Sequence, residues 1–370
     1  MIVGEGAAAF KPYDAEGRVG AQWRPMDLSR FPRRRYTAGP TPIEPLPRFT
    51  AALAAACPPG RRPEIWVKRD DQLGLFPGGN KTRKLEFLVA DALARGADTL
   101  VTCGAPQSNH CRITLSAAVK EGLRCRLVIE ERVPQSFRED ASGNHFLFRL
   151  MGVDGLRVVP AGTDMAAAMQ EEVAAAAAAG RRAYVIPGGG SNAIGGLGYV
   201  ACTQELLGQW FDRGLRIDHV VVGSGSSGTH GGMLAGFLGH RVSVPLIGIG
   251  VSRDPADQVP LVRREAQAVL DLLGLDLTVG PDDVRCVGGY WQPKYSVPNA
   301  RMVEAVQWLA RTEGLLLDPV YTGKIMAGLI GLAREGYFRD GERVLFMHTG
   351  GMPGLFAYQP EVLGHAPVGA

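Results

Sequence analysis

The chain has no long hydrophobic run, no signal for secretion and no large excess of charge of one sign. The apolar stretch at 173–179 ends at Gly180, well short of the ~18 residues that cross a bilayer. The N-terminus lacks the basic and apolar regions of a signal peptide. With 40 basic and 37 acidic residues, the formal net charge is only +3, which indicates neither a nucleic-acid nor a membrane partner. We expect a cytoplasmic protein.

Cysteine and histidine are present without metal-binding spacing. The six cysteines form no CxxC pair and no zinc pattern with histidine. Several lie in apolar runs, so we expect buried free thiols in a reducing compartment. His110, His230 and His348 also lack ligand spacing, and the sequence predicts no metal site.

Glycine is the residue in excess. It accounts for 49 of the 370 residues, almost twice the usual share of roughly 7%. No G-X-Y period accompanies it, and 46% hydrophobic residues argue against disorder. The glycines gather at 78–79, 188–190, 195–198, 223–228 and 350–351. There we expect the backbone to turn tightly or to approach a ligand closely.

Short β-rich runs alternate with helical patterns, which predicts βαβ units and parallel sheets covered on both faces. Strands are expected at 65–68, 99–103, 126–129, 157–159, 183–186, 219–222, 246–251 and 344–348, and helices at 82–95, 164–179, 299–312 and 323–335. The length favours two domains, with a boundary near 188–198. Residues 1–40 resemble an arm, in which Arg33, Arg34 and Arg35 are either solvated or contact a nucleic acid or subunit.

One lysine follows two glycines just before a predicted helix. Lys81, in the run GGNKTRK at 78–84, would stand at a helix N-terminus, where the helix dipole disfavours a positive charge. Its amine could have a lowered pKa and attack a carbonyl; the alternative is an ordinary lysine in a turn. The run is not a phosphate-binding Walker A loop. That pattern requires Gly-Lys-Ser/Thr, whereas Asn80 precedes Lys81 here.

Two loops that follow predicted strands are suited to anions. Ser108 and Asn109 favour a helix N-cap whose free N–H groups hold a carboxylate, or which simply caps the helix. The run GSGSSGT at 223–229 matches the dinucleotide pattern G-x-G-x-x-G, but no acidic residue for a ribose occurs from 229 through 253. Its many hydroxyls favour a terminal phosphate instead.

Near the C-terminus, DPVYTGK at 318–324 and HTGG at 348–351 add polar groups. Tyr321 could act on a proton or be a half-buried core residue. Lys324 is interpreted as a surface or helix charge. Thr349 follows a predicted strand, where α/β sheets bind ligands.

A lysine amine, a phosphate loop and a carboxylate site together fit pyridoxal 5'-phosphate with an amino-acid substrate. Two other classes stay open from the residues alone. One is a phosphate-ligand binding protein without catalysis, and the other is a dinucleotide oxidoreductase.

Seven motifs also resemble the D-cysteine desulfhydrase / 1-aminocyclopropane-1-carboxylate deaminase family, from about residue 28 to 360. They are PTPIEP at 40–45, WVKRDD at 66–71, GGNKTRKLE at 78–86, QSNH at 107–110, GSGSSGT at 223–229, DPVYTGK at 318–324 and HTGG at 348–351. The resemblance implies the tryptophan-synthase-β-like fold (fold type II) and a homodimer. It implies a large cofactor domain of 1–85 plus 199–370, with an N-terminal arm at 1–27, and a small domain of 86–198.

The resemblance also implies roles for single residues. Lys81 would hold the cofactor covalently, Asn80 would contact its phenolic oxygen, and Thr322 and Thr349 would lie near its ring nitrogen. The phosphate would contact Gly225, Ser226, Ser227, Gly228 and Thr229. The substrate carboxylate would bind Ser108 and Asn109 with His110 close by, and Tyr295 and Tyr321 would line the substrate side. Lys81, Ser108, Tyr295 and Tyr321 would be catalytic.

Threonine at 322 and 349 is similar to the desulfhydrases, whereas deaminases have Glu and Leu there. A neutral threonine gives a weaker electron sink than a glutamate, which argues for β-elimination over cyclopropane opening. The sequence therefore predicts a lyase that converts D-cysteine to pyruvate, ammonia and hydrogen sulfide. AGTDM at 161–165 and PGGGSN at 187–192 are closer to L-cysteate sulfo-lyases, and Lys294 or Arg112 could neutralise a sulfite leaving group. A cyclopropane deaminase is the weaker alternative.

Overall fold

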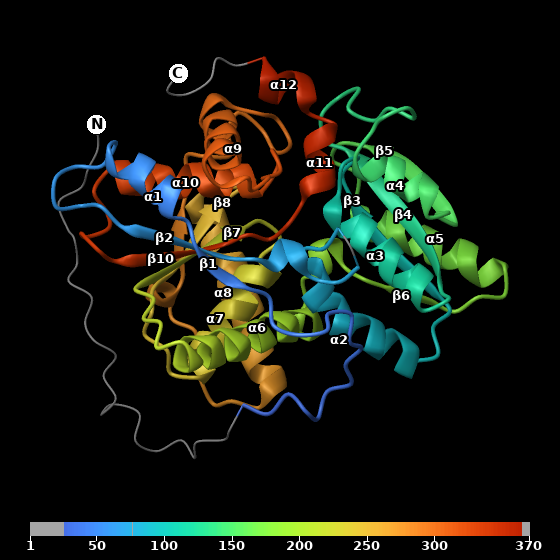
Figure 1. Ribbon diagram of the computed structural model, residues 1–370. Helices are drawn as coiled ribbons and strands as arrows, with labels where there is room; N and C mark the ends of the chain where they lie inside the picture. The colour runs from blue at the N-terminus through green and yellow to red at the C-terminus, as the bar shows by residue number, and fades with distance from the viewer. Residues whose placement is uncertain (1–25, 76, 365–370) are drawn as a thin grey trace.

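The computed structural model describes residues 26–75 and 77–364, and it contains two parallel-rich sheets (Figure 1). The larger sheet has the order β1 (Ile43–Pro45), β2 (Glu64–Lys68), β10 (Arg343–Met347), β7 (His219–Ser224), β8 (Leu246–Gly250) and β9 (Arg285–Val287). Only β1 runs antiparallel to its neighbour. The smaller sheet has the order β5 (Gly155–Pro160), β4 (Arg124–Glu131), β3 (Thr99–Gly104) and β6 (Ala183–Val185), all parallel. The predicted α/β class with open parallel sheets is confirmed.

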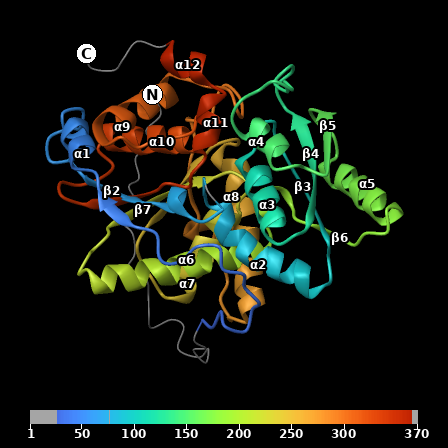
Figure 2. The same cartoon turned by 45° about the vertical axis from the view of Figure 1, so that its right-hand side comes forward.

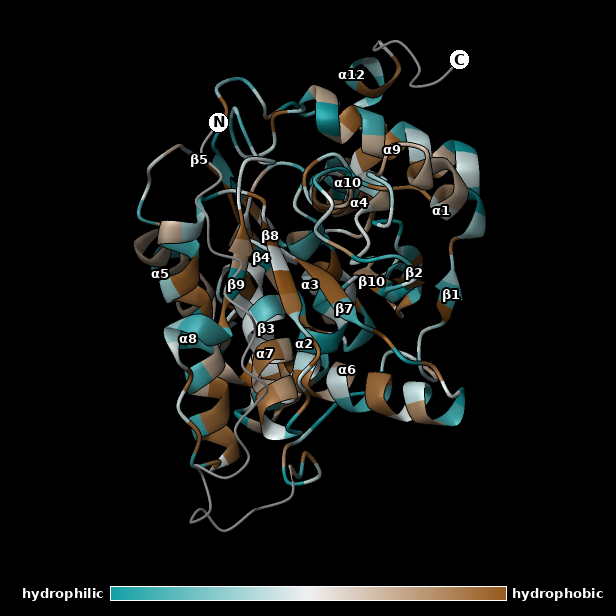
Figure 3. Ribbon diagram, turned by 90° about the vertical axis from the view of Figure 1, so that its left-hand side faces the viewer, coloured by the Kyte–Doolittle hydropathy of each residue, from teal (hydrophilic) through white to brown (hydrophobic). Residues whose placement is uncertain are grey.

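Alternate side chains of the larger sheet enter two separate cores, as the period of a strand requires. In β10, Val344 and Phe346 pack on one face, while Leu345 and Met347 pack on the other. The first face is covered by α1 (Pro47–Ala54), α9 (Ala300–Glu313) and α10 (Thr322–Arg334), and the second by α6 (Ala193–Asp212), α7 (Gly228–Gly239) and α8 (Pro255–Leu273). Figure 3 shows the central strands β7 and β8 in the hydrophobic colour between these layers.

The smaller sheet is covered in the same way (Figure 2). Leu100 and Leu127 face a core that includes α2 (Lys81–Ala94), α3 (Asn109–Lys120) and α4 (Asn144–Leu150). Val101 and Val128 face α5 (Met165–Ala178) on the opposite side. Two short helices, α11 (Met352–Phe356) and α12 (Gln359–Leu363), close the chain.

The predicted strands and helices all coincide with observed ones, to within two residues at each end. The prediction did not include the three-residue strands β1 and β9. It also gave no range for several helices, among them the long helices α6 and α8. The thiols of Cys103, Cys111, Cys125 and Cys202 are buried and free, whereas Cys57 and Cys286 are free but only partly buried. No helix within 26–75 and 77–364 is long and apolar enough to cross a membrane.

The described part of the N-terminal segment lies against α2 and α3. Arg33 forms an ion pair with Glu86 at 2.5 Å, and Arg34 pairs with Glu121 at 2.9 Å. The interpretation of this arginine cluster as a solvated arm is therefore wrong for Arg33, which keeps 20% side-chain exposure. Residues 1–25 of the predicted arm lie outside the described residues.

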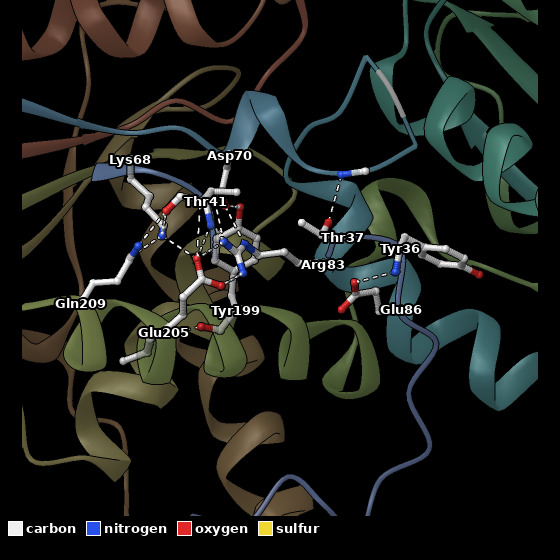
Figure 4. Close-up of polar contacts among 12 residues, drawn as sticks. Tyr36, Thr37, Thr41, Lys68, Asp70, Arg83, Glu86, Tyr199, Glu205 and Gln209 are labelled. Atoms are coloured by element: carbon white, nitrogen blue, oxygen red, sulfur yellow. Dashed lines mark hydrogen bonds and ion pairs between the residues drawn. The ribbon is translucent and has the colours of Figure 1, made fainter. Parts of the chain in front are cut away.

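A buried polar network fixes α2 to the larger sheet and to α6 (Figure 4). The Arg83 guanidinium donates to Asp70 at 2.7 and 2.9 Å and to Glu205 at 2.8 Å. Lys68 donates to Glu205 at 2.5 Å, and the Tyr199 hydroxyl donates to Asp70 at 2.9 Å. Burial alone would raise the pKa of Asp70, but Arg83, Lys68 and Thr41 together outweigh it and hold that pKa below its ordinary value. Each buried charge thus has a partner, as burial requires.

The glycines at 195–198 serve helix packing rather than a ligand. A Cβ on Gly198 would lie 2.3 Å from the Arg83 carbonyl oxygen, and one on Gly196 would lie 2.3 Å from a Val269 methyl carbon. The expectation of a ligand approach at these positions is therefore wrong. Glycine lets α6 lie close to α2 and α8.

Candidate active site

The carboxyl ends of strands from both sheets face one cavity of about 760 Å³. This is the edge at which parallel α/β sheets bind ligands. Among the residues predicted to form a site, the cavity is lined by Asn80, Lys81, Ser108, Asn109, His110, Gly225, Ser226, Ser227, Tyr295, Tyr321 and Thr349. Gly228, Thr229 and Thr322 lie behind this lining. The described residues contain no cluster of three side chains that could hold a metal ion.

Lys81 is the first residue of α2, and its amine is buried beside the cavity. Nζ has one polar contact, at 3.4 Å from the Asn80 side-chain oxygen. Burial lowers the pKa of Lys81 to about 8, against a smaller opposing effect of Asp318. The direction of this shift is the predicted one, but its cause is burial rather than the helix dipole. A larger fraction of the amine is therefore unprotonated near neutral pH than in an ordinary lysine.

The loop after β7 provides an anion cradle at the start of α7. Ser227 caps α7 without a side-chain hydrogen bond and has a φ of 72°, so the first turn of the helix keeps backbone donors available. The Gly228 N–H donates to Ser191 Oγ at 3.2 Å, and Ser191 Oγ donates to Ser226 Oγ at 2.9 Å. Asn80 Nδ2 donates to Thr229 Oγ1 at 2.9 Å, which joins the cradle to the lysine.

Lys84 reaches the same cradle from the next turn of α2. It is fully buried, and its Nζ donates to the Gly189 carbonyl at 3.0 Å. A Cβ on Gly228 would lie 2.8 Å from this amine. Burial, and then the nearby Lys81, lower the pKa of Lys84 well below its ordinary value. The nearby Glu265 opposes this effect without reversing it, and a phosphate in the cradle would add negative charge next to the buried amine.

The opposite wall begins at α3. Ser108 is the N-cap, and its Oγ accepts from the Cys111 N–H at 3.1 Å. Asn109 Oδ1 accepts from Arg112 Nη2 at 2.5 Å. The Arg112 side chain is fully buried behind Asn109 and does not line the cavity. The hypothesis that Arg112 neutralises a leaving group is therefore wrong, whereas Lys294 does line the cavity.

His110 presents a neutral ring. Thr102 Oγ1 donates its proton to the Ile186 carbonyl at 2.7 Å, so it can only accept from His110 Nε2 at 2.8 Å. Burial, and then Lys81 and Lys84, hold the pKa of His110 well below its ordinary value. Nδ1 is thereby left as an acceptor without a hydrogen-bond partner within the described part of the chain.

Two tyrosines face each other across the third wall. The hydroxyls of Tyr295 and Tyr321 lie 2.6 Å apart, and burial raises the pKa of both phenols. Lys324, one turn after Tyr321, is fully buried and donates to the carbonyls of Trp291 and Lys294 at 2.9 and 3.2 Å. Because Lys324 is buried, its interpretation as a surface charge is wrong. Its hydrogen bonds instead hold the loop that contains Tyr295 against α10.

Asp318 organises the start of α10. Its carboxylate accepts from the N–H groups of Val320, Tyr321 and Thr322 at 2.8–2.9 Å. Thr322 Oγ1 donates to the same carboxylate at 2.8 Å and is buried behind the cavity lining. Of the two threonines predicted near the ring nitrogen, Thr322 and Thr349, it is Thr349 that lines the cavity.

Sequence reasoning missed Lys84, Ser191 and Arg132 as residues of this region. Lys84 carried a signal, because residues at i and i+3 share one face of a helix. Ser191 and Arg132 carried none: each approaches the cavity from a loop whose course depends on the packing of the smaller sheet.

The fold and this cavity define an α/β enzyme of the pyridoxal-phosphate type, with the Lys81 amine between the glycine- and serine-rich loop before α7 and the N-terminus of α3. The chain belongs to the family of pyridoxal-phosphate dependent enzymes, whose pattern it matches over residues 35–350. Pyridoxal 5'-phosphate is the cofactor, and the residues present fit it.

Solved structures support this assignment. The chain is similar to a crystal structure described as an ACC deaminase homologue, with 36% identity, a TM-score of 0.80, and coverage of 91% of this chain and 97% of that chain. O-ureido-L-serine synthase shares the fold at 19% identity and a TM-score of 0.62, covering 90% of this chain and 95% of that one. A pyridoxal 5'-phosphate-dependent aspartate racemase shares it at 16% identity and a TM-score of 0.59, with 84% and 90% covered.

Proposed function

We propose that the protein is a β-eliminating carbon–sulfur lyase that converts D-cysteine and water to pyruvate, ammonia and hydrogen sulfide. The cofactor, when bound, supplies an electron sink for the charge that develops at the substrate Cα. Lys81 is placed to remove the Cα proton with its amine, whose pKa is lowered to about 8. The N-terminus of α3, with Ser108 and Asn109, binds the substrate carboxylate.

The two threonines, Thr322 at the start of α10 and Thr349 after β10, are the observation that carries this proposal. Thr349 lines the cavity with a hydroxyl. Thr322 is tied to Asp318. The Asp318 carboxylate is itself occupied by backbone N–H groups. Asp318 lines the cavity, but its carboxylate is already engaged by these donors, so we infer a weak electron sink that favours a substrate with a good leaving group over a cyclopropane.

A second candidate, L-cysteate sulfo-lyase activity, is favoured by the cations on the substrate side. Lys294 and Arg132 both line the cavity near Tyr295, and either could neutralise a sulfonate. The product with this substrate would be sulfite in place of sulfide.

A side-by-side assay tests these functions. The holoenzyme is offered D-cysteine, L-cysteine, L-cysteate and 1-aminocyclopropane-1-carboxylate, and sulfide, sulfite, pyruvate and 2-oxobutyrate are measured. We expect sulfide and pyruvate from D-cysteine at the highest kcat/KM. Production of 2-oxobutyrate at a comparable rate would refute the argument from Thr322 and Thr349.

A further inference from the structure

Arg132 occupies a position in the cavity that the proposed reaction with D-cysteine does not use. It directly follows β4, at the carboxyl edge of the smaller sheet, and it lines the cavity. Its guanidinium lies 4.8 Å from the centroid of the Tyr295 ring. This stacking places the cation beside the tyrosine pair, since Tyr295 and Tyr321 share a hydrogen bond of 2.6 Å. Arg132 therefore belongs to the side of the cavity that receives the substrate side chain.

Only part of the Arg132 guanidinium is engaged in hydrogen bonds within the described residues. Nε donates to Glu130 at 2.5 Å, while neither Nη atom has an acceptor among the described residues. These remaining donors lie on the planar fork that suits carboxylate and sulfonate groups. Glu130 also lines the cavity, and its carboxylate neutralises part of the positive charge of Arg132.

The Arg132–Glu130 ion pair differs from a surface ion pair with the same separation in sequence. Arg138 and Asp140 are also two residues apart, but their side chains are 69% and 73% exposed and neither lines the cavity. Arg132 and Glu130 are 40% and 12% exposed. Because charge interactions strengthen as water is excluded, the cavity pair can influence a ligand in a way that the exposed pair cannot.

We propose that Arg132 is a specificity-determining residue that favours amino acids with a negatively charged side chain, and that Glu130 moderates this preference. This inference rests on the proposed function in one respect, namely that the cavity binds a small amino acid. It bears on the second candidate, L-cysteate, whose sulfonate would place a negative charge at the substrate Cβ.

Aspartate and asparagine test the proposal, because they have nearly the same shape and differ in side-chain charge. Their dissociation constants for the holoenzyme are measured by titration calorimetry, with both enantiomers of each. We expect the wild type to bind aspartate about tenfold more tightly than asparagine. Arg132→Gln should bring this ratio close to one, and Glu130→Gln should increase it. The control Arg138→Gln should leave it unchanged.

Equal binding of aspartate and asparagine by the wild type, or no binding of either, would overturn the proposal, as would an unchanged ratio in Arg132→Gln. Circular dichroism and cofactor content establish that each variant is folded. If Arg132→Gln is not folded, an unchanged ratio in Glu130→Gln overturns the proposal by itself. Because neither ligand is required to react, failure of the lyase assay leaves this measurement unaffected.

Discussion

Arg112 donates to the side-chain oxygen of Asn109 at 2.5 Å, and it is a fully buried cation that has no carboxylate partner within residues 26–75 and 77–364. Its other hydrogen bonds go to neutral oxygens, those of Asn144 and Leu75. Such a charge is costly unless an anion approaches it. A substrate carboxylate bound at Asn109 would lie in front of this charge, so we expect Arg112 to act through Asn109 as a positioning residue for substrate binding.

Arg112→Met should therefore affect binding more than turnover. We expect KM to rise about tenfold or more, with a smaller fall in kcat, since one charge-assisted interaction is lost. Steady-state kinetics with the best substrate checks this split, and Arg112→Lys should restore part of the affinity. An unchanged KM in a folded Arg112→Met variant would contradict the role.

Lys81→Ala should lose nearly all activity while it keeps its fold. Positioned proton transfer by this amine is worth roughly 10²–10⁴-fold, so kcat should fall by at least that factor. Borohydride reduction followed by mass analysis should find cofactor attached at Lys81 in the wild type and none in the variant. Cofactor still fixed to the variant would show that another lysine carries it.

Cofactor attachment should depend on pH in a way that reflects the buried lysine. The amine attacks only when it is unprotonated, and burial lowers its pKa to about 8. The rate at which apoprotein captures pyridoxal phosphate should thus rise with pH and level off above about 8, as stopped-flow absorbance can show. A rate that keeps rising toward pH 10.5, the ordinary pKa of lysine, would show that the Lys81 amine is exposed to solvent and that its pKa is not lowered.

Lys84→Met should weaken cofactor binding without removing the attachment residue. The dissociation constant of the cofactor should increase by about 10–100-fold, because a charge-assisted contact to phosphate is lost. Fluorescence titration of the apoprotein measures this change. Lys120→Met, at the exposed end of α3, is the control, and an equal effect in both variants would argue against a phosphate contact.

Two glycines of α6 should respond oppositely to alanine. Gly198→Ala would place a Cβ 2.3 Å from the Arg83 carbonyl oxygen, and we expect a loss of at least about 1–3 kcal/mol in the free energy of unfolding. At Gly208 a Cβ meets nothing within 4 Å, so Gly208→Ala should stabilise the protein by about 0.5–1 kcal/mol. Urea denaturation of both variants measures the difference, and equal effects would refute the packing role of Gly198.

The sequence was informative where a pattern is local. Within the predicted strands, 220–222 and 344–347 are apolar at every position because both faces of their sheet are covered. The lysine at the start of α2 and the N-cap at Ser108 were also recognisable from adjacent residues.

What the sequence did not reveal depends on contacts between distant segments. Lys324 is a charged residue whose partners are carbonyls about thirty positions away, so its burial has no local signature. Arg112 adjoins the predicted QSNH motif, but the direction of its side chain follows from the position of Asn144. The glycines at 195–198 resemble a ligand loop until α6 is placed against α2 and α8.

The helix α2 touches three different environments at once. Lys81 and Lys84 face the cavity region, Arg83 enters the ionic network of the larger sheet, and Leu85 and Leu88 fill the core of the smaller sheet. A rotation of this helix would disturb all three together. The position of the Lys81 amine is therefore fixed by folding and does not depend on ligand binding. Substitutions in α2 that leave stability unchanged should be confined to its last turn, where only Ala94 is exposed.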